Sequence, residues 1–177
     1  MPAIVGGSRG ACVDSLLGNR TRYGVRRPGR VGGMSVVVQR VSVVDGELVE
    51  AFARLVPQVS RTAVVPDAAA LRRVLDHPGN RMLVARVDGT VRGTLTLVVF
   101  PIPTGTRAWI EDVVVDGAAR GGGVGAALTR AAVELAREEG ARTVDLTSRP
   151  TRPAANRLCE RIGFRVRDSR VYRFGGP

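Results

Sequence analysis

The sequence contains no lysine, so all 27 of its strongly basic side chains are arginines. A P-loop requires a lysine directly after its glycines, so this class of nucleotide site is excluded. Lysine is likewise excluded as a catalytic base. The single histidine, His77, lies in a His-Pro-Gly sequence, which predicts a turn residue rather than a catalytic one.

Cysteine and aromatic residues are scarce. The two cysteines, Cys12 and Cys159, lie far apart and imply no disulfide framework, which favours a cytoplasmic protein. Aromatic residues are only 4% of the chain, so nucleic acid is disfavoured as a partner despite a net charge of +11. No apolar run reaches the length of a membrane span, so no membrane partner is expected.

Residues 1–33 differ from the rest of the chain in composition. They hold six arginines, one acidic residue and many glycines, with no periodic apolar pattern. This composition predicts a disordered tail or an extension. An arginine-rich targeting peptide is the alternative, which the glycines disfavour because they break amphipathic helices. Residues 34–177 are predicted to form one domain.

The most informative stretch joins a strand to a helix through a glycine-rich turn. The strand spans Ile110 to Val115, the helix begins near Val124, and the turn reads Arg120-Gly-Gly-Gly-Val-Gly125. Glycines allow positive φ angles, so successive amides can point to one anion at the helix N-terminus. A dinucleotide-binding fingerprint fits this turn only weakly, because five residues separate the strand from the first glycine.

The turn resembles the Arg/Gln-x-x-Gly-x-Gly/Ala acetyl-CoA motif of the GCN5-related N-acetyltransferases, or GNAT family. The strand at 110–115 is similar to the one preceding that motif in polyamine and glucosamine-phosphate acetyltransferases. Residues 155–164 are similar to the late Ala-x-x-Leu-Tyr-x-x-x-Gly-Phe element of the family. The resemblance covers about residues 35 to 175 and implies an α/β fold. Its mixed central sheet is splayed at the acetyl-CoA site and carries helices on both faces.

Apolar periodicity and turn signals predict the element order of this fold. Pro57 is expected to end the first helix, and Gly163 is expected to cap the last one. The predicted strands are 35–43, 82–87, 91–100, 107–115 and 143–147, followed by a final hairpin of 164–167 and 170–174. The predicted helices are 45–57, 66–77, 124–140 and 153–163.

The resemblance also implies how acetyl-CoA is bound. Backbone groups of the strand would meet the pantetheine and thioester, the turn amides would meet the pyrophosphate, and Asn156 would touch the pantetheine. No metal site is expected. The implied cofactor-binding residues are Val113, Val114, Val115, Arg120, Gly121, Gly122, Gly123, Val124, Gly125, Ala126 and Asn156.

Two catalytic residues are predicted. Glu111 matches the glutamate of the family's Ile/Leu-Glu-Asp pattern and is favoured over Asp112 as the base, with a solvated or salt-bridged acid as the alternative. Cys159 stands where the family has a tyrosine that protonates CoA. It is either the acid or a small buried apolar residue.

The predicted activity is transfer of the acetyl group of acetyl-CoA to a primary amine of a small molecule or peptide, directly within a ternary complex. The missing tyrosine leaves a second hypothesis open, a regulatory or catalytically degenerate domain that binds acetyl-CoA without turnover. A homodimer is compatible with either hypothesis.

Overall fold

The computed structural model describes residues 35–60 and 62–175, and the predicted tail at 1–33 lies outside them. A five-stranded sheet in the order β1-β2-β3-β4-β5 forms the centre of the molecule. Neighbouring strands are antiparallel except for the parallel pair β4–β5, so the sheet is mixed as predicted. The elements are β1 Val36–Arg40, α1 Gly46–Val59, α2 Ala68–Asp76, β2 Asn80–Val87, β3 Thr90–Ile102, β4 Gly105–Val115, the 3-10 helix η1 Gly117–Ala119, α3 Val124–Glu138, β5 Thr143–Leu146 and α4 Pro153–Ile162.

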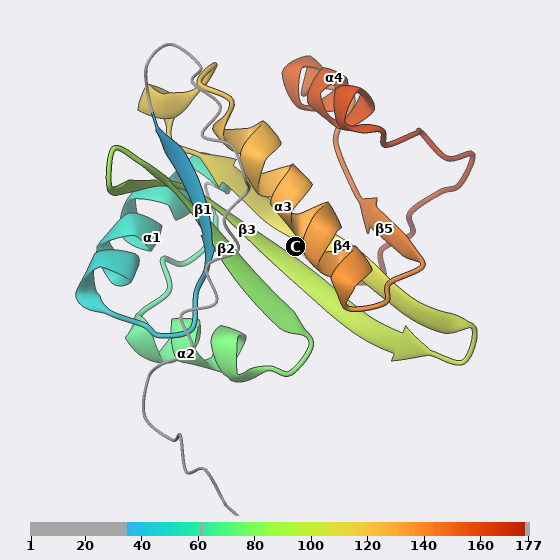
Figure 1. Ribbon diagram of the computed structural model, residues 1–177, viewed down its shortest axis with the longest axis horizontal. Helices are drawn as coiled ribbons and strands as arrows, with labels where there is room; N and C mark the ends of the chain where they lie inside the picture. Colours follow the sequence, from blue (N-terminus) through green and yellow to red (C-terminus); the bar gives the residue numbers. More distant parts are fainter. Residues whose placement is uncertain (1–34, 61, 176–177) are drawn as a thin grey trace, which may run out of the picture.

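Helices cover both faces of the sheet (Figure 1). One apolar cluster lies under α3 and contains Leu83, Leu95 and Leu128. A second cluster lies under α1 and α2 and contains Leu55, Leu71 and other buried residues. The amphipathic pattern read from the sequence therefore corresponds to two half-cores, each buried against one sheet face.

Local sequence explains how several elements begin and turn. The carboxylate of Asp45 accepts a hydrogen bond from the Leu48 amide at 2.8 Å, which caps α1 as predicted. The β2–β3 hairpin turns at Asp88 and Gly89, whose φ angles of 48° and 83° are the positive pair that a two-residue hairpin turn requires. Gly163, with φ 111°, caps the end of α4 as predicted.

The prediction that Pro57 ends the first helix is wrong, because α1 continues to Val59. A proline removes one backbone donor, so the Ala53 carbonyl loses its intrahelical partner. Ala53 is exposed and its carbonyl can meet water. The Gln58 side chain also donates to the Arg54 carbonyl at 3.1 Å and supports this last turn.

The predicted C-terminal hairpin is also wrong, because residues 164–175 contain neither helix nor strand. Val166, Val171, Tyr172 and Phe174 are each at least 73% exposed. The alternation of apolar residues with arginines indicated strands, but a strand is stabilised mainly by what its apolar face packs against. Phe164 packs against the cluster under α3, but the apolar side chains from Val166 onward meet no core, so alternation alone does not produce pairing.

Candidate functional site

β4 separates from β5 in the middle of its length. The last paired residues are Ile110 and Leu146, although β4 continues to Val115. Beyond Ile110 the β5-facing edge of β4 has no strand partner within the described part of the chain. The sheet is therefore splayed here, which confirms that part of the predicted fold.

A β-bulge lies directly after the last paired residue. Thr96 is in register with Glu111, and Thr94 with Val114, so two residues of β4 face Leu95 alone. Asp112 adopts φ 48°, a left-handed conformation that aspartate tolerates better than most residues. The regular alternation of side chains along this strand is thus interrupted at Asp112.

The bulge determines where the three valines point. Val113 and Val115 pack against the cluster under α3, whereas Val114 is buried in the cluster under α1 and α2. Their side chains therefore pack in the core, as expected. Their backbone groups on the β5 side have no neighbouring strand. The contact of this backbone with acetyl-CoA stays a prediction.

The glycine-rich turn leads from β4 into α3. Gly121 has φ 80° and Gly123, the N-cap of α3, has φ 73°, which L side chains rarely adopt. Within the described residues no side chain caps this helix. Its first intrahelical bond runs from the Ala127 amide to the Gly123 carbonyl at 2.9 Å, so the amides of residues 123–126 have no acceptor inside the helix. The Gly122 amide donates to the Ala119 carbonyl at 3.3 Å. A Cβ at Gly121 would have no atom within 4 Å, so the space beside this glycine is open.

This end of α3 has the backbone features that suit an anion. The aligned peptide dipoles make a helix N-terminus positive, and uncapped amides can donate to phosphate oxygens. The residues predicted for the pyrophosphate, from Gly121 to Ala126, all lie in the turn or in the first turn of α3. Arg120 precedes them and is exposed.

Two glycines allow close packing around the start of α3. A Cβ at Gly93 on β3 would lie 3.0 Å from Leu128 Cδ1 and 3.1 Å from Val124 Cγ1, so α3 packs directly on the bare backbone. A Cβ at Gly125 would lie 3.3 Å from Leu158 Cδ2. The packing of α4 over the start of α3 therefore also depends on a missing side chain.

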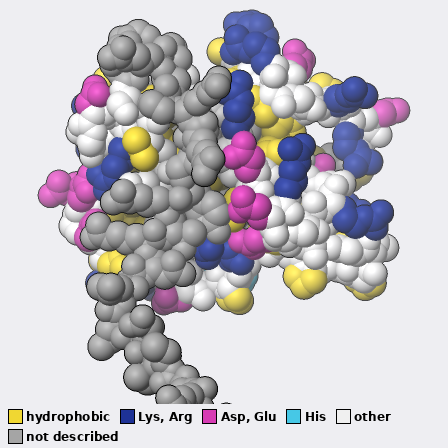
Figure 2. Space-filling model, viewed as in Figure 1, with side chains coloured by type: hydrophobic (Ala, Val, Ile, Leu, Met, Phe, Trp, Pro, Cys, Tyr) yellow, Lys and Arg dark blue, Asp and Glu magenta, His cyan; other side chains and the backbone are white. Residues whose placement is uncertain are grey.

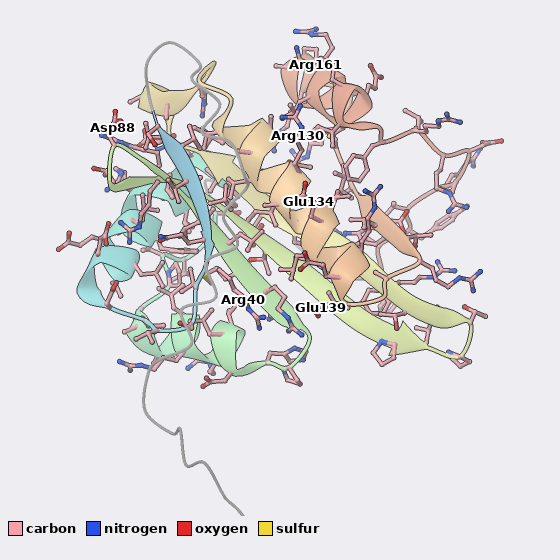
Figure 3. All side chains as sticks on the ribbon, viewed as in Figure 1. Arg40, Asp88, Arg130, Glu134, Glu139 and Arg161 are labelled. Atoms are coloured by element: carbon pink, nitrogen blue, oxygen red, sulfur yellow. The ribbon has the colours of Figure 1, made fainter. Side chains whose placement is uncertain are left out.

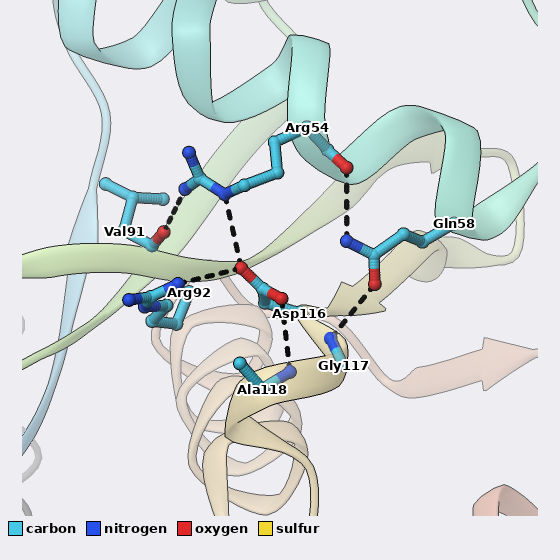
Figure 4. A network of polar contacts seen from close by, with 7 residues as sticks. All are labelled: Arg54, Gln58, Val91, Arg92, Asp116, Gly117 and Ala118. Atoms are coloured by element: carbon cyan, nitrogen blue, oxygen red, sulfur yellow. Dashed lines mark hydrogen bonds and ion pairs between the residues drawn. The ribbon is translucent and has the colours of Figure 1, made fainter.

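A buried carboxylate holds the start of the turn (Figure 4). Asp116, only 7% exposed, accepts hydrogen bonds from Arg54 Nε at 3.2 Å and Arg92 Nη1 at 3.1 Å. Its other oxygen accepts from the Ala118 amide at 3.2 Å. The Ala118 amide and the two guanidinium groups lower the pKa of this carboxyl, although its burial opposes the shift.

Sequence reasoning missed this group of residues. The Asp116-Gly117 pair directly after a buried strand is a turn signal that marks Asp116. No comparable signal marks Arg54, Gln58 or Arg92, because their partners are 24 to 62 residues away in the chain.

The two candidate bases lie at the bulge, and both are exposed. Glu111 follows Ile110, which faces α3, and is in register with Thr96, whose own partner Met82 belongs to the cluster under α1 and α2. Glu111 is therefore on the face of β4 that α1 and α2 cover. Asp112 occupies the bulge itself, with its backbone in the left-handed region.

The predicted residues of α4 lie on its half-buried side. Burial raises the pKa of the Cys159 thiol, with a smaller contribution from Glu160, so the thiol stays protonated at neutral pH. A protonated thiol is compatible both with proton donation to CoA and with packing as a small apolar residue. Asn156 donates from Nδ2 to the Arg149 carbonyl at 3.3 Å, which fixes the loop before α4.

His77 is a turn residue, as predicted. It follows α2, is exposed, and its Nδ1 accepts from the Gly79 amide at 3.1 Å. Across residues 35–60 and 62–175, no three histidine, cysteine, aspartate or glutamate side chains gather as metal ligands would. None of the helices in these ranges is long and apolar enough to cross a membrane.

The family model described as "Acetyltransferase (GNAT) family" matches residues 48–164. The chain belongs to this family. The match includes the bulged strand, the glycine turn and α4. A comparison with curated proteins gave no match. Members of the GNAT family generally use acetyl-CoA.

Solved structures share the fold of this GNAT chain. A transcriptional regulator from Bacillus halodurans C-125 is 26% identical, with a TM-score of 0.68 over 79% of this chain and 99% of that one. An aminoglycoside acetyltransferase from an uncultured soil metagenomic sample, in complex with sisomicin, is 20% identical, with a TM-score of 0.70 over 80% and 96%. The aminoglycoside N-acetyltransferase AAC(6')-Iy in complex with CoA is 16% identical, with a TM-score of 0.66 over 81% and 96%.

Arginines dominate the surface around α4 of this GNAT chain. Figure 2 shows several basic side chains on the side of the molecule formed by α4, β5 and residues 164–175. All of them are arginines, because the sequence contains no lysine. Arg161 on α4 and Arg130 on α3 are labelled in Figure 3, where Glu134 lies further along α3. A positive potential on this side would attract a polyanionic ligand.

Proposed function

We propose that this GNAT domain transfers the acetyl group of acetyl-CoA to a primary amine of a small molecule or peptide, directly within a ternary complex. One observation carries the proposal. The glycine turn presents an uncapped helix N-terminus next to the part of β4 that has left β5. The amides of the turn can donate hydrogen bonds to a polyanion. The unpaired backbone of β4 can hydrogen-bond to an extended thioester arm.

The residues of the site have distinct roles in this proposal. The amides from Gly121 to Ala126 hold the pyrophosphate, with Arg120 beside them, and backbone groups of Val113 to Val115 hold the pantetheine and thioester. Asn156 contributes a further polar contact to the pantetheine. The bound acetyl-CoA supplies an activated acyl group on sulfur. Residues 34–177 form the transferase domain, and 1–33 an extension.

Two side chains move protons in the proposed reaction. The amine nitrogen forms a bond to the acyl carbon while the bond from that carbon to sulfur breaks. Glu111 accepts the proton that the amine loses, directly or through water, and Asp112 is the alternative base. Cys159 gives its thiol proton to the departing sulfur and regains one from solvent. Its raised pKa is compatible with this role because the thiol is protonated when transfer begins.

Binding is tested with two variants of the helix N-cap. Asparagine and aspartate both tolerate left-handed φ, and they differ mainly in one charge. We expect Gly123→Asp to bind acetyl-CoA at least about tenfold more weakly than Gly123→Asn, since an added carboxylate repels a phosphate at the helix N-terminus. Calorimetric titration measures both affinities, with thermal melting as the check on folding. Equal affinities for the two folded variants would reject the assignment of the turn.

Turnover distinguishes the enzyme from the second candidate, a domain that only binds acetyl-CoA. The replacement of the family's tyrosine by Cys159 favours that candidate. Thiol release from acetyl-CoA should be screened against simple amines, amino sugars, polyamines, peptide N-termini and aminoglycosides, the last because a relative of similar fold was solved with sisomicin. Steady release well above hydrolysis with any acceptor supports the transferase. Binding without release across the panel supports the binding-only domain. A homodimer stays a prediction that analytical ultracentrifugation can check.

A further inference from the structure

The C-terminal half of α1 is attached to the strand-to-turn junction by two side chains. Arg54 donates from Nε to Asp116, and Gln58 accepts at Oε1 from the Gly117 amide at 3.0 Å. Figure 4 shows both side chains reaching down from the helix to this junction. Asp116 and Gly117 lead through η1 into the glycines that begin at Gly121. Arg54 and Gln58 therefore connect a helix on one sheet face to the start of the proposed cofactor turn.

The end of α1 lacks one helical hydrogen bond, although Leu55 is fully buried and the Ser60 amide donates to the Val56 carbonyl at 3.1 Å. Pro57 lacks the amide that would bond to the Ala53 carbonyl, and no basic side chain lies in the last turn. The segment after the helix is largely exposed, with Val64 90% exposed. Gln58 itself bonds at both ends of its amide, to Gly117 and to the Arg54 carbonyl. The two bonds to the junction therefore act together with the packing of Leu55 and its neighbours against the cluster under α1 and α2.

We infer that Gln58 and Arg54 are positioning residues that couple the glycine turn to the end of α1, so that occupancy of the turn further stabilises residues 55–60. The inference rests on the proposed function, since it requires CoA at the turn. Coupling between two sites is reciprocal, so the end of α1 must equally influence the affinity of the turn. Residues 60 and 62–67 follow α1 and contain neither helix nor strand, so this route relates cofactor binding to a segment outside the turn.

The test uses the complete chain and CoA alone as the probe. Gln58→Met keeps the length of an exposed side chain but removes both of its hydrogen bonds. Hydrogen exchange by mass spectrometry is measured on peptides covering 55–60 and 121–127, with and without CoA. In the parent chain we expect CoA to slow exchange in both segments. In Gln58→Met we expect slowing only in 121–127, and an affinity for CoA that is about threefold to tenfold lower.

Glu47→Gln provides a matched control on the same helix. Glu47 lies in the first turn of α1 and pairs with Arg86 at 2.8 Å, at the opposite end from the junction. This variant should retain slowing in both segments. If CoA slows 55–60 equally in Gln58→Met, or leaves 55–60 unchanged in the parent while slowing 121–127, the coupling is refuted and the proposed function stands. If CoA neither binds nor slows 121–127 in the parent, the proposed function fails and the coupling fails with it.

Discussion

Replacing Asp116 by asparagine tests whether the charge of this buried residue stabilises the turn. Asparagine has nearly the same shape and can still accept from the Ala118 amide through its oxygen. Its amide group, however, offers hydrogen-bond donors where Arg54 and Arg92 also donate. The variant therefore removes two charge-assisted hydrogen bonds while it preserves the volume of the side chain.

The two hydrogen bonds that Asp116→Asn removes are of intermediate strength. A hydrogen bond to a charged group contributes about 1.5–3 kcal/mol, whereas exposed ion pairs contribute about 0.2–1 kcal/mol. The side chain of Asp116 is 10% exposed, but those of Arg54 and Arg92 are 40% and 35% exposed, so solvent screens part of each interaction. We expect the free energy of unfolding to fall by about 1–3 kcal/mol and the melting temperature by about 3–10 °C.

The effect of Asp116→Asn should also depend on pH. The pKa of the Asp116 carboxyl is lowered in the folded chain, chiefly by the Ala118 amide and then by the two arginines. Such a group stabilises the fold above its unfolded pKa, near ~3.9, and loses that contribution as the pH falls through the folded value. The difference in stability between parent and variant should therefore be constant from pH 7 to about pH 5 and shrink below about pH 4.

Urea unfolding followed by circular dichroism, from pH 7 to the lowest pH at which the parent folds, measures this difference. Glu47→Gln is the control, since it breaks a more exposed pair with Arg86 and should cost less than about 1 kcal/mol. A melting temperature of Asp116→Asn within 1 °C of the parent would contradict a stabilising role for the charge. A large difference that stays the same at acid pH would attribute the loss to packing instead.

Further predictions concern catalysis, packing and the N-terminal segment. Glu111→Gln should lower kcat by about 10²-fold to 10⁴-fold at neutral pH in steady-state assays while acetyl-CoA affinity holds, and full activity would move the base to Asp112 or solvent. Cys159→Ala should slow turnover and Cys159→Tyr restore it if the thiol is the acid, whereas an unchanged rate for Cys159→Ala identifies a packing residue. Gly93→Ala should cost about 1–3 kcal/mol in urea unfolding, because its Cβ would press on Leu128 and the backbone of β4. A chain starting at Met34 should melt close to the full-length protein, and a large drop would show that 1–33 pack on the domain.

The sequence by itself determined the parts of this protein that depend on neighbouring residues. Apolar periodicity located the strands and helices of the domain core, Asp45 and Gly163 marked caps, and Asp88-Gly89 marked a hairpin. Each of these signals reflects conformational preferences of a few residues next to one another. The glycine turn between strand and helix was equally local, which is why its motif led to the GNAT family before any tertiary contact was known.

Tertiary structure alone decided the features that depend on partners distant in sequence. The bulge at Asp112 arises from register with β3, and the length of one strand read alone does not reveal it. The three groups that share the Asp116 carboxylate include two arginines from α1 and β3, which only folding brings together. The alternation at 164–174 suggested strands, but strand pairing requires a face to bury, and beyond Phe164 the apolar side chains of this segment are exposed. Local sequence preference favours a helix or a strand. The free energy of packing between distant segments determines whether that element forms and which residues it brings together.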